Sequence, residues 1–102
     1  MSECNLALNA NINGKEQPNK LYVHGSIMVY SANDQVVIKE ANPQGINDRI
    51  LLLSLEVIEI PGPMKGVCKP YVYEKEVDGQ QYDQVTVVNG DESTTVDVQY
   101  FG

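Results

Sequence analysis

The chain has 102 residues and a mass of 11.3 kDa, which suffices for one domain but not for two ordinary ones. Hydrophobic residues make up 42% and charged residues 21%, which is typical of a globular protein and excludes a collagen-like fibre or a low-complexity linker. The formal net charge is −7, from 7 basic and 14 acidic residues, and this balance argues against binding to nucleic acid or to an anionic membrane surface. We therefore expect a single domain spanning residues 1–102.

No segment has the features of a membrane span or an export signal. The longest apolar run, residues 50–60, is interrupted by Ser54, Glu56 and Glu59, and it is shorter than the roughly 18 residues that a spanning helix needs. The N-terminus lacks the cationic and apolar regions of a secretory signal. The expectation is a cytoplasmic protein with no membrane contact. The alternative is an exported mature chain whose signal is not in this sequence.

Period-two alternation of apolar and polar residues dominates the first forty residues and predicts strands. The alternation is clearest in residues 4–12 and 21–30, which we expect to pair as antiparallel neighbours across the polar loop at residues 14–19. Residues 31–34 indicate a turn, and residues 35–40 a short strand with Val36 and Ile38 on one face.

The segment from Arg49 to Ile60 has two readings. Residues 51–55 are apolar enough for a buried helical turn. The β-branched residues at its end and the abrupt stop at Pro61-Gly62-Pro63 favour a strand. Because both faces are largely apolar, we expect a central strand.

The last third of the chain contains two turn signals. Asp78-Gly79 predicts a hairpin between residues 71–77 and 80–88, and Asn89-Gly90 predicts a second one leading into residues 93–101. This register places Val72 opposite Val85 and Val85 opposite Val96. The expected core face of this three-stranded meander consists of Val72, Val85, Val87, Val96, Val98 and Tyr100, with Tyr71, Tyr73 and Tyr82 on the outward face.

Seven strands without a crossover helix indicate an all-β fold. The expected architecture is an antiparallel β-sandwich, immunoglobulin-like or transthyretin-like in its layering. A small β-barrel is the alternative.

A search for catalytic and metal-binding groups is mostly negative. With one histidine, His24, and with Cys4 and Cys68 far apart in the sequence, the chain lacks the spacing of a zinc site or a redox motif. A disulfide between the two cysteines and two separate thiols both remain open. The predicted register brings Glu74 opposite Asp83, and residues 89–92 offer oxygen ligands, but neither has the arrangement of a glycosidase pair or a calcium loop. We therefore expect no enzymatic activity, no metal and no cofactor.

Tyrosine and acidic residues point to a binding role. Six of the seven aromatic residues are tyrosine, a residue enriched in recognition surfaces, although cross-strand pairing on a solvated face accounts for it equally. Residues 71–102 hold 7 acidic and 1 basic side chains, which suits a basic partner or simply a soluble face. The sequence predicts a non-catalytic binding or protein-interaction module whose partner is another protein, basic in character. The alternative is a structural subunit that assembles through strand edges into a homo-oligomer. The candidate binding residues are Tyr71, Tyr73, Tyr82, Tyr22, Tyr30 and His24.

Overall fold

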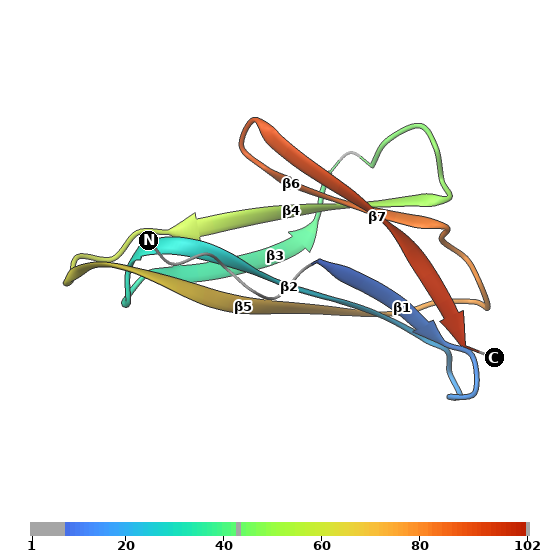
Figure 1. The fold of residues 1–102 in the computed structure, drawn as a ribbon. Helices are drawn as coiled ribbons and strands as arrows, with labels where there is room; N and C mark the ends of the chain where they lie inside the picture. Colours follow the sequence, from blue (N-terminus) through green and yellow to red (C-terminus); the bar gives the residue numbers. More distant parts are fainter. Residues whose placement is uncertain (1–7, 43, 102) are drawn as a thin grey trace.

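The computed structural model describes residues 8–42 and 44–101, with the backbone alone at residues 64 and 65. Within this part of the chain the structure consists of strands and the loops that join them (Figure 1). The strands are β1 (Asn9–Asn13), β2 (Lys20–Ser31), β3 (Gln35–Glu40), β4 (Ile50–Ile58), β5 (Met64–Glu76), β6 (Gln84–Asn89) and β7 (Glu92–Phe101). The predicted all-β fold is confirmed.

All seven strands belong to one mixed sheet in the order β3-β4-β6-β7-β1-β2-β5. Two of its pairings, β1 with β7 and β4 with β6, are parallel. Strand β7 joins the two halves of the sheet, because its first part pairs with β6 and its last part, Val98–Phe101, pairs with β1. The sheet curves until its two edge strands approach each other, so the small barrel fits the structure, whereas an antiparallel sandwich is not confirmed.

Side chains join the two edge strands, β3 and β5, where no backbone ladder does. Tyr73 Oη and Lys75 Nζ of β5 both donate to the Glu40 Oε2 atom of β3, the latter over 2.9 Å. Further along, Lys69 Nζ donates to the Asp34 carbonyl oxygen over 2.5 Å. We call this row of contacts the β3–β5 seam. It closes one side of the molecule.

The core follows the predicted alternation in β2, β3 and β4. The inward positions of β2 and β4 are almost completely buried, and Val36 and Ile38 of β3 pack against them. The segment with two readings is a strand, β4, and it lies centrally between β3 and β6 as expected. The largest fully buried side chains of the described residues are Ile12, Leu21, Val23, Val29, Leu51, Leu53 and Val85. The predicted strand at residues 4–12 is described only from residue 8 onward, where β1 pairs antiparallel with β2.

The hairpin predicted at Asp78-Gly79 is wrong. Strand β5 pairs with β2 along its length and does not pair with β6. Gly79 does adopt a positive φ of 57°, but the turn belongs to a loop held by Asn19, whose carbonyl oxygen accepts from Val77 N at 3.0 Å and whose Oδ1 accepts from Gly79 N at 3.1 Å. A turn-forming dipeptide thus reverses the chain without making its flanking strands neighbours.

The different partner of β5 inverts the predicted faces of that strand. Directly opposite residues of an antiparallel pair share a face, and β2 places Gly25 opposite Tyr71 and Val23 opposite Tyr73. Tyr71 is therefore only 8% exposed, and Val72, predicted to lie in the core, is 60% exposed. Gly25 makes this packing feasible, because a Cβ atom there would lie 2.6 Å from Tyr71 Oη.

The second predicted hairpin is confirmed. Strands β6 and β7 pair antiparallel with Val85 opposite Val96, as the sequence predicts. The loop between them is Gly90-Asp91, and Gly90 has a φ of 61°, which is typical of the first central position of a type II′ turn. Val85, Val87 and Val98 are buried as expected, but Tyr100 is 40% exposed, so its predicted place in the core is wrong.

Candidate functional site

The structure does not bring the six candidate binding residues onto one surface. Tyr22, His24 and Tyr30 alternate with buried residues of β2 and lie on its outward side, with Tyr30 the most exposed. The other three tyrosines do not lie on that outward side. Tyr71 belongs to the core, and Tyr73 and Tyr82 are half-buried against it. The prediction that Tyr71, Tyr73 and Tyr82 form one outward face is wrong, because β5 takes its register from β2 and not from β6.

Two of these tyrosines are engaged by carboxylates. Tyr22 Oη donates to both oxygens of Glu16, at 3.0 and 2.8 Å, and this hydrogen bond, with some burial, raises the pKa of Tyr22. Burial and the hydrogen bond to Glu40 raise the pKa of Tyr73. Both hydroxyls are therefore protonated donors at neutral pH, and their role in the fold is to hold neighbouring segments.

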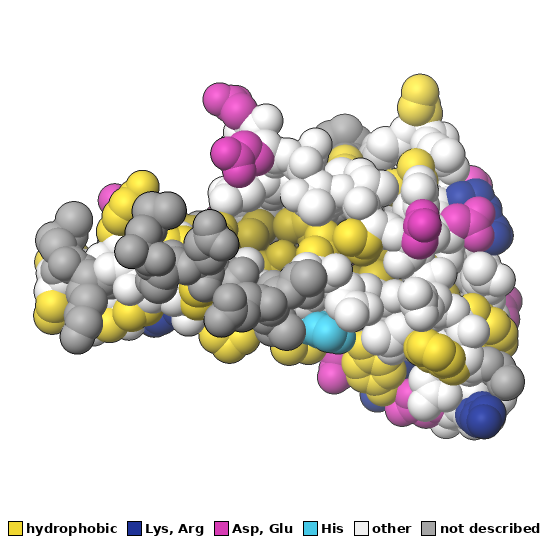
Figure 2. Space-filling model, in the orientation of Figure 1, with side chains coloured by type: hydrophobic (Ala, Val, Ile, Leu, Met, Phe, Trp, Pro, Cys, Tyr) yellow, Lys and Arg dark blue, Asp and Glu magenta, His cyan; other side chains and the backbone are white. Residues whose placement is uncertain are grey.

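A cleft opens on the side of the molecule where β2 and the β6–β7 hairpin diverge. It has a volume of about 280 Å³. Figure 2 shows hydrophobic side chains in the hollow below the projecting hairpin. Its apolar floor comes from four strands and consists of Ile27, Leu55, Tyr71 and Val87, with Leu8, Ser26, Asn89, Glu92 and Thr94 around it. We call this feature the β2–β7 cleft.

The pairing of β7 explains why the cleft exists. Strand β1 accompanies β7 only beside Val98–Phe101, and the described part of β1 begins at Asn9. Beyond that point the β6–β7 hairpin rises away from β2 (Figure 1). Over the described residues, therefore, no strand lies beside residues 93–96 on the edge of β7 opposite β6.

The hydrogen-bonding pattern of the hairpin shows which backbone groups this edge presents. In a two-residue hairpin the residues flanking the turn, here Asn89 and Glu92, form a hydrogen-bonded pair, and such pairs then recur at every second residue. Val98 N belongs to the same series, since it donates to the Asp83 carbonyl at 2.8 Å. The N–H and C=O groups of Ser93 and Thr95 consequently point away from β6, along the open edge.

Negative charge gathers at the tip of the hairpin, where Asp91 and Glu92 are both exposed. Figure 2 shows acidic side chains, in magenta, at the upper end of the projecting hairpin. The ion pairs among the described side chains are Lys39 with Glu56, Arg49 with Asp83, and Lys75 with Glu40. None of them involves the hairpin tip, so its charge is not neutralised by a described basic side chain.

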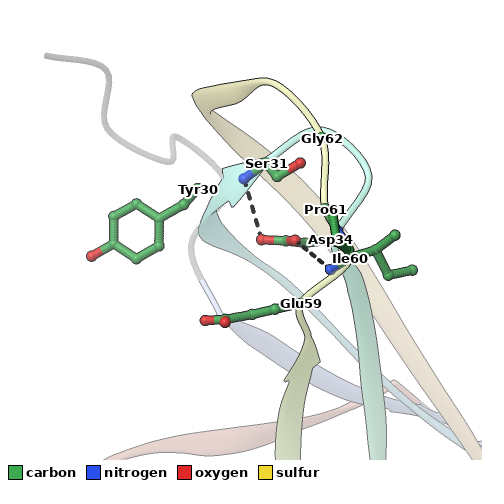
Figure 3. A pocket seen from close by; sticks show the side chains of 7 residues that line it. All are labelled: Tyr30, Ser31, Asp34, Glu59, Ile60, Pro61 and Gly62. Atoms are coloured by element: carbon green, nitrogen blue, oxygen red, sulfur yellow. Dashed lines mark hydrogen bonds between the residues drawn. The ribbon is translucent and has the colours of Figure 1, made fainter.

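A larger cavity of about 480 Å³ lies at the ends of β2 and β4, lined by Tyr30, Ser31, Asp34, Glu59, Ile60, Pro61 and Gly62 (Figure 3). Asp34 is its buried acid, and both carboxylate oxygens are already engaged: Oδ2 accepts from Ser31 N at 3.2 Å and Oδ1 from Ile60 N at 3.1 Å. Tyr30 points away from that carboxylate in Figure 3. The arrangement fixes the β2–β3 turn to the segment that follows β4.

The described residues hold no group of three or more metal-ligating side chains. The predicted opposition of Glu74 and Asp83 is wrong, because Glu74 lies opposite Tyr22 on β2. Asp83 instead accepts two hydrogen bonds from Arg49, at 3.1 and 2.7 Å, which lower the pKa of Asp83. Residues 89–92 form the hairpin turn. Cys68 is disulfide-bonded, and Cys4 lies outside the described residues.

None of the described segments is a helix with the length and apolarity needed to cross a bilayer.

Compared with protein-family models, with curated protein sequences and with solved structures, the chain shows no match. The argument for function therefore depends on the site itself. Sequence reasoning missed the cleft, because its floor is assembled from β2, β4, β5 and β6, and no local pattern reports which strands converge. The one signal that pointed there was the concentration of acidic residues in the last third of the chain.

Proposed function

We propose that this protein is a non-catalytic module that binds another protein, and that the partner binds at the β2–β7 cleft and the adjoining edge of β7. The observation that carries this proposal is an apolar cleft beside an edge of β7 that has no neighbouring strand over the described residues. Exposed apolar surface bordered by polar groups marks interaction sites. An edge strand with exposed N–H and C=O groups is a template for further pairing.

The composition of the cleft favours binding over catalysis. Glu92 is the acid on its wall, and the remaining side chains are apolar or neutral, with Tyr71 in the floor. Burial raises the pKa of Tyr71, so its hydroxyl is a poor proton acceptor at neutral pH. Acid-base catalysis commonly uses a pair of positioned proton-transfer groups, and Glu92 is the one carboxylate among the described residues that line the cleft.

The charge of the hairpin tip favours a basic partner. Asp91 and Glu92 would attract a cationic segment and repel an acidic one.

Assembly of identical copies through their strand edges is the second candidate, and the exposed edge of β7 is the observation that favours it. A symmetric pairing of two such edges would, however, bring acidic residues of the two copies close together, since Glu92 and Asp97 flank the edge. We therefore place binding of a different, basic protein first.

Selection from a displayed library of random peptides tests the proposal. Thr94→Trp fills the cleft from its wall, and Thr95→Trp is the matched control, because the neighbouring residue faces outward and hydrogen-bonds to Thr86 across the hairpin. We expect the selected peptides to bind the Thr94→Trp variant about tenfold more weakly or worse, equivalent to about 1.4 kcal/mol. The Thr95→Trp variant should bind them as the wild type does. Failure to enrich any peptide, or equal binding by the three proteins, would contradict the proposal.

A further inference from the structure

We infer that Asn89 is a site of spontaneous modification by water, at which the side-chain amide is converted to a carboxylate or the backbone to an isoaspartyl linkage. This chemistry belongs to the turn between β6 and β7, and it does not depend on the proposed function. The chain supplies its own comparison, because it contains two Asn-Gly pairs, Asn13-Gly14 and Asn89-Gly90.

The reaction needs only the chain and water. The backbone nitrogen of the glycine attacks the side-chain carbonyl carbon of the asparagine and closes a cyclic imide. The side-chain nitrogen leaves as ammonia, which takes up the proton that the backbone nitrogen loses. Water then adds to one of the two imide carbonyls and breaks its C–N bond, which leaves either aspartate or isoaspartate. A glycine at the attacking position favours closure, because it has no Cβ atom and a flexible backbone.

The two pairs have nearly the same local sequence. Ile12 precedes Asn13 at the end of β1, and Val88 precedes Asn89 at the end of β6. Both asparagines thus follow a β-branched residue and precede a glycine. In an unfolded chain they should react at similar rates, so a large difference in the folded protein must come from the tertiary structure.

The structure protects the first pair. Gly14 N, the attacking nitrogen, donates to the Phe101 carbonyl oxygen over 2.6 Å, and Asn13 Oδ1 accepts from Lys15 N over 3.1 Å. Asn13 is also paired with β2 on one side and with β7 on the other. Closing the imide here requires the chain to break these hydrogen bonds and to separate β1 from its neighbours.

The second pair lies at the exposed end of a hairpin that projects from the rest of the sheet (Figure 1). The β6–β7 ladder ends with Asn89 opposite Glu92, so the Gly90 N–H is outside it, and no described group accepts from that N–H. Gly90 is exposed, and a Cβ atom on it would meet no described atom within 4 Å. Rotation of the Asn89 backbone toward its side chain therefore disturbs only the last pair of the hairpin, where strands fray most readily.

Both products would change the hairpin tip. Aspartate at position 89 adds a carboxylate next to the exposed Asp91 and Glu92. Isoaspartate adds a backbone atom to a two-residue turn whose length sets the register of its strands, so this product should weaken the hairpin.

The test compares the two asparagines within one molecule. The folded protein and the protein unfolded in urea are incubated in a mildly alkaline buffer made with heavy-oxygen water, digested with trypsin and analysed by mass spectrometry. Because Lys75 is the last basic residue, the peptide of residues 76–102 contains Asn89 as its only asparagine, and the peptide that ends at Lys15 reports on Asn13. The variants Asn89→Ser and Asn13→Ser are a matched pair, followed by ion-exchange chromatography.

We expect Asn89 to convert at least about tenfold faster than Asn13 in the folded protein, because the first pair must lose more hydrogen bonds before it reacts. In urea the two rates should agree within about threefold. Each conversion should incorporate heavy oxygen. The more acidic species that forms on incubation should disappear in Asn89→Ser and persist in Asn13→Ser.

Three results would overturn this assignment. Equal rates at both sites of the folded protein, or a faster rate at Asn13, would show that the Gly14 hydrogen bond does not protect. No conversion of Asn89 in the folded protein, over a time in which the unfolded chain reacts, would show that the hairpin end is itself protected. A tenfold difference that persists in urea would assign the selectivity to local sequence and not to the fold.

Discussion

The β3–β5 seam and the β2–β7 cleft are two places where the described residues form no continuous backbone ladder, and they differ in the side chains that line them. At the seam, the long side chains of Lys69, Tyr73 and Lys75 reach from β5 to acceptors on or beside β3. At the cleft, the described lining is apolar or neutral apart from Glu92. Among the described residues, charged and hydroxyl side chains therefore bridge the seam, whereas apolar side chains form the floor of the cleft.

The largest expected effect lies at Tyr71, a buried residue of β5 whose ring also forms part of the cleft floor. Replacing this buried ring by alanine removes a large part of the packing around Gly25 and should lower the free energy of unfolding by about 3 kcal/mol or more. Tyr30→Ala is the control, because Tyr30 is 71% exposed and its loss should cost about 0.5 kcal/mol or less. Urea denaturation measures both. Similar costs for the two variants would mean that the assigned faces of β2 and β5 are wrong.

Proline substitutions on β7 should lower the free energy of unfolding by different amounts, depending on whether the lost N–H points to β6 or away from it. Thr94 lies in the series of residues whose N–H points to β6, so Thr94→Pro loses a ladder hydrogen bond and should cost about 2 kcal/mol. The N–H of Ser93 points the other way, and Ser93→Pro should cost about 0.5 kcal/mol or less. Native-state hydrogen exchange gives the same contrast without mutation: the Thr94 amide should exchange slowly and the Ser93 amide fast. If the Ser93 amide exchanged more slowly than the Thr94 amide, the assignment of which N–H groups point toward β6 would be wrong.

Glu40→Gln should weaken the seam in a pH-dependent way. The hydrogen bond from Tyr73 and then the contact with Lys75 lower the pKa of Glu40 below its ordinary value of 4.5. A carboxyl whose pKa is lower in the folded state stabilises the fold above the unfolded-state value, and this stabilisation is lost as the pH falls through the folded-state value. At pH 7 the variant should therefore be less stable by about 1 kcal/mol, a modest figure because the Glu40 side chain is 37% exposed.

The measurement is the free energy of unfolding between pH 7 and pH 3 for both proteins. We expect the two curves to converge below pH 4.5. Glu56→Gln is the control, because its 3.6 Å pair with Lys39 is exposed on both sides and should contribute little at any pH. Parallel curves for the wild type and Glu40→Gln would show that Glu40 does not help to close the seam.

The smallest expected effect is that of a glutamate-to-glutamine substitution at the β2–β7 cleft. Glu92→Gln removes a charge that no described residue pairs with, so the free energy of unfolding should change by less than about 0.5 kcal/mol. Thermal melts at low and high salt measure this. A loss comparable to that of Glu40→Gln would mean that Glu92 serves the fold, and the contrast between the two regions would then fail.

The elements that the sequence predicted correctly are those whose signal is local. Alternation in β2, β3 and β4 reports directly which residues are buried, because the side-chain period of a strand is two. The turn at Gly90 was found for a similar reason, since a positive φ at that position favours glycine and sets the register of its own two strands. The all-β class follows from such signals together.

Strand partners were decided by the tertiary structure. Asp78-Gly79 carries as strong a turn signal as Asn89-Gly90, yet β5 pairs with β2, about fifty residues away in the chain, and β6 pairs with β4. Once Gly25 stands opposite Tyr71, that ring turns inward, and the predicted tyrosine face is lost with it.

The composition and periodicity of the chain determined that it is acidic and all-β, with apolar strands and tight turns. Only the tertiary structure decided that its sheet is mixed, that long side chains of β5 bridge to β3, and that described residues of four strands form the floor of a cleft bordered by Thr94 and Glu92. The reason is that a strand's own sequence specifies which of its faces can be buried, whereas its partner is chosen by packing between residues far apart in the chain.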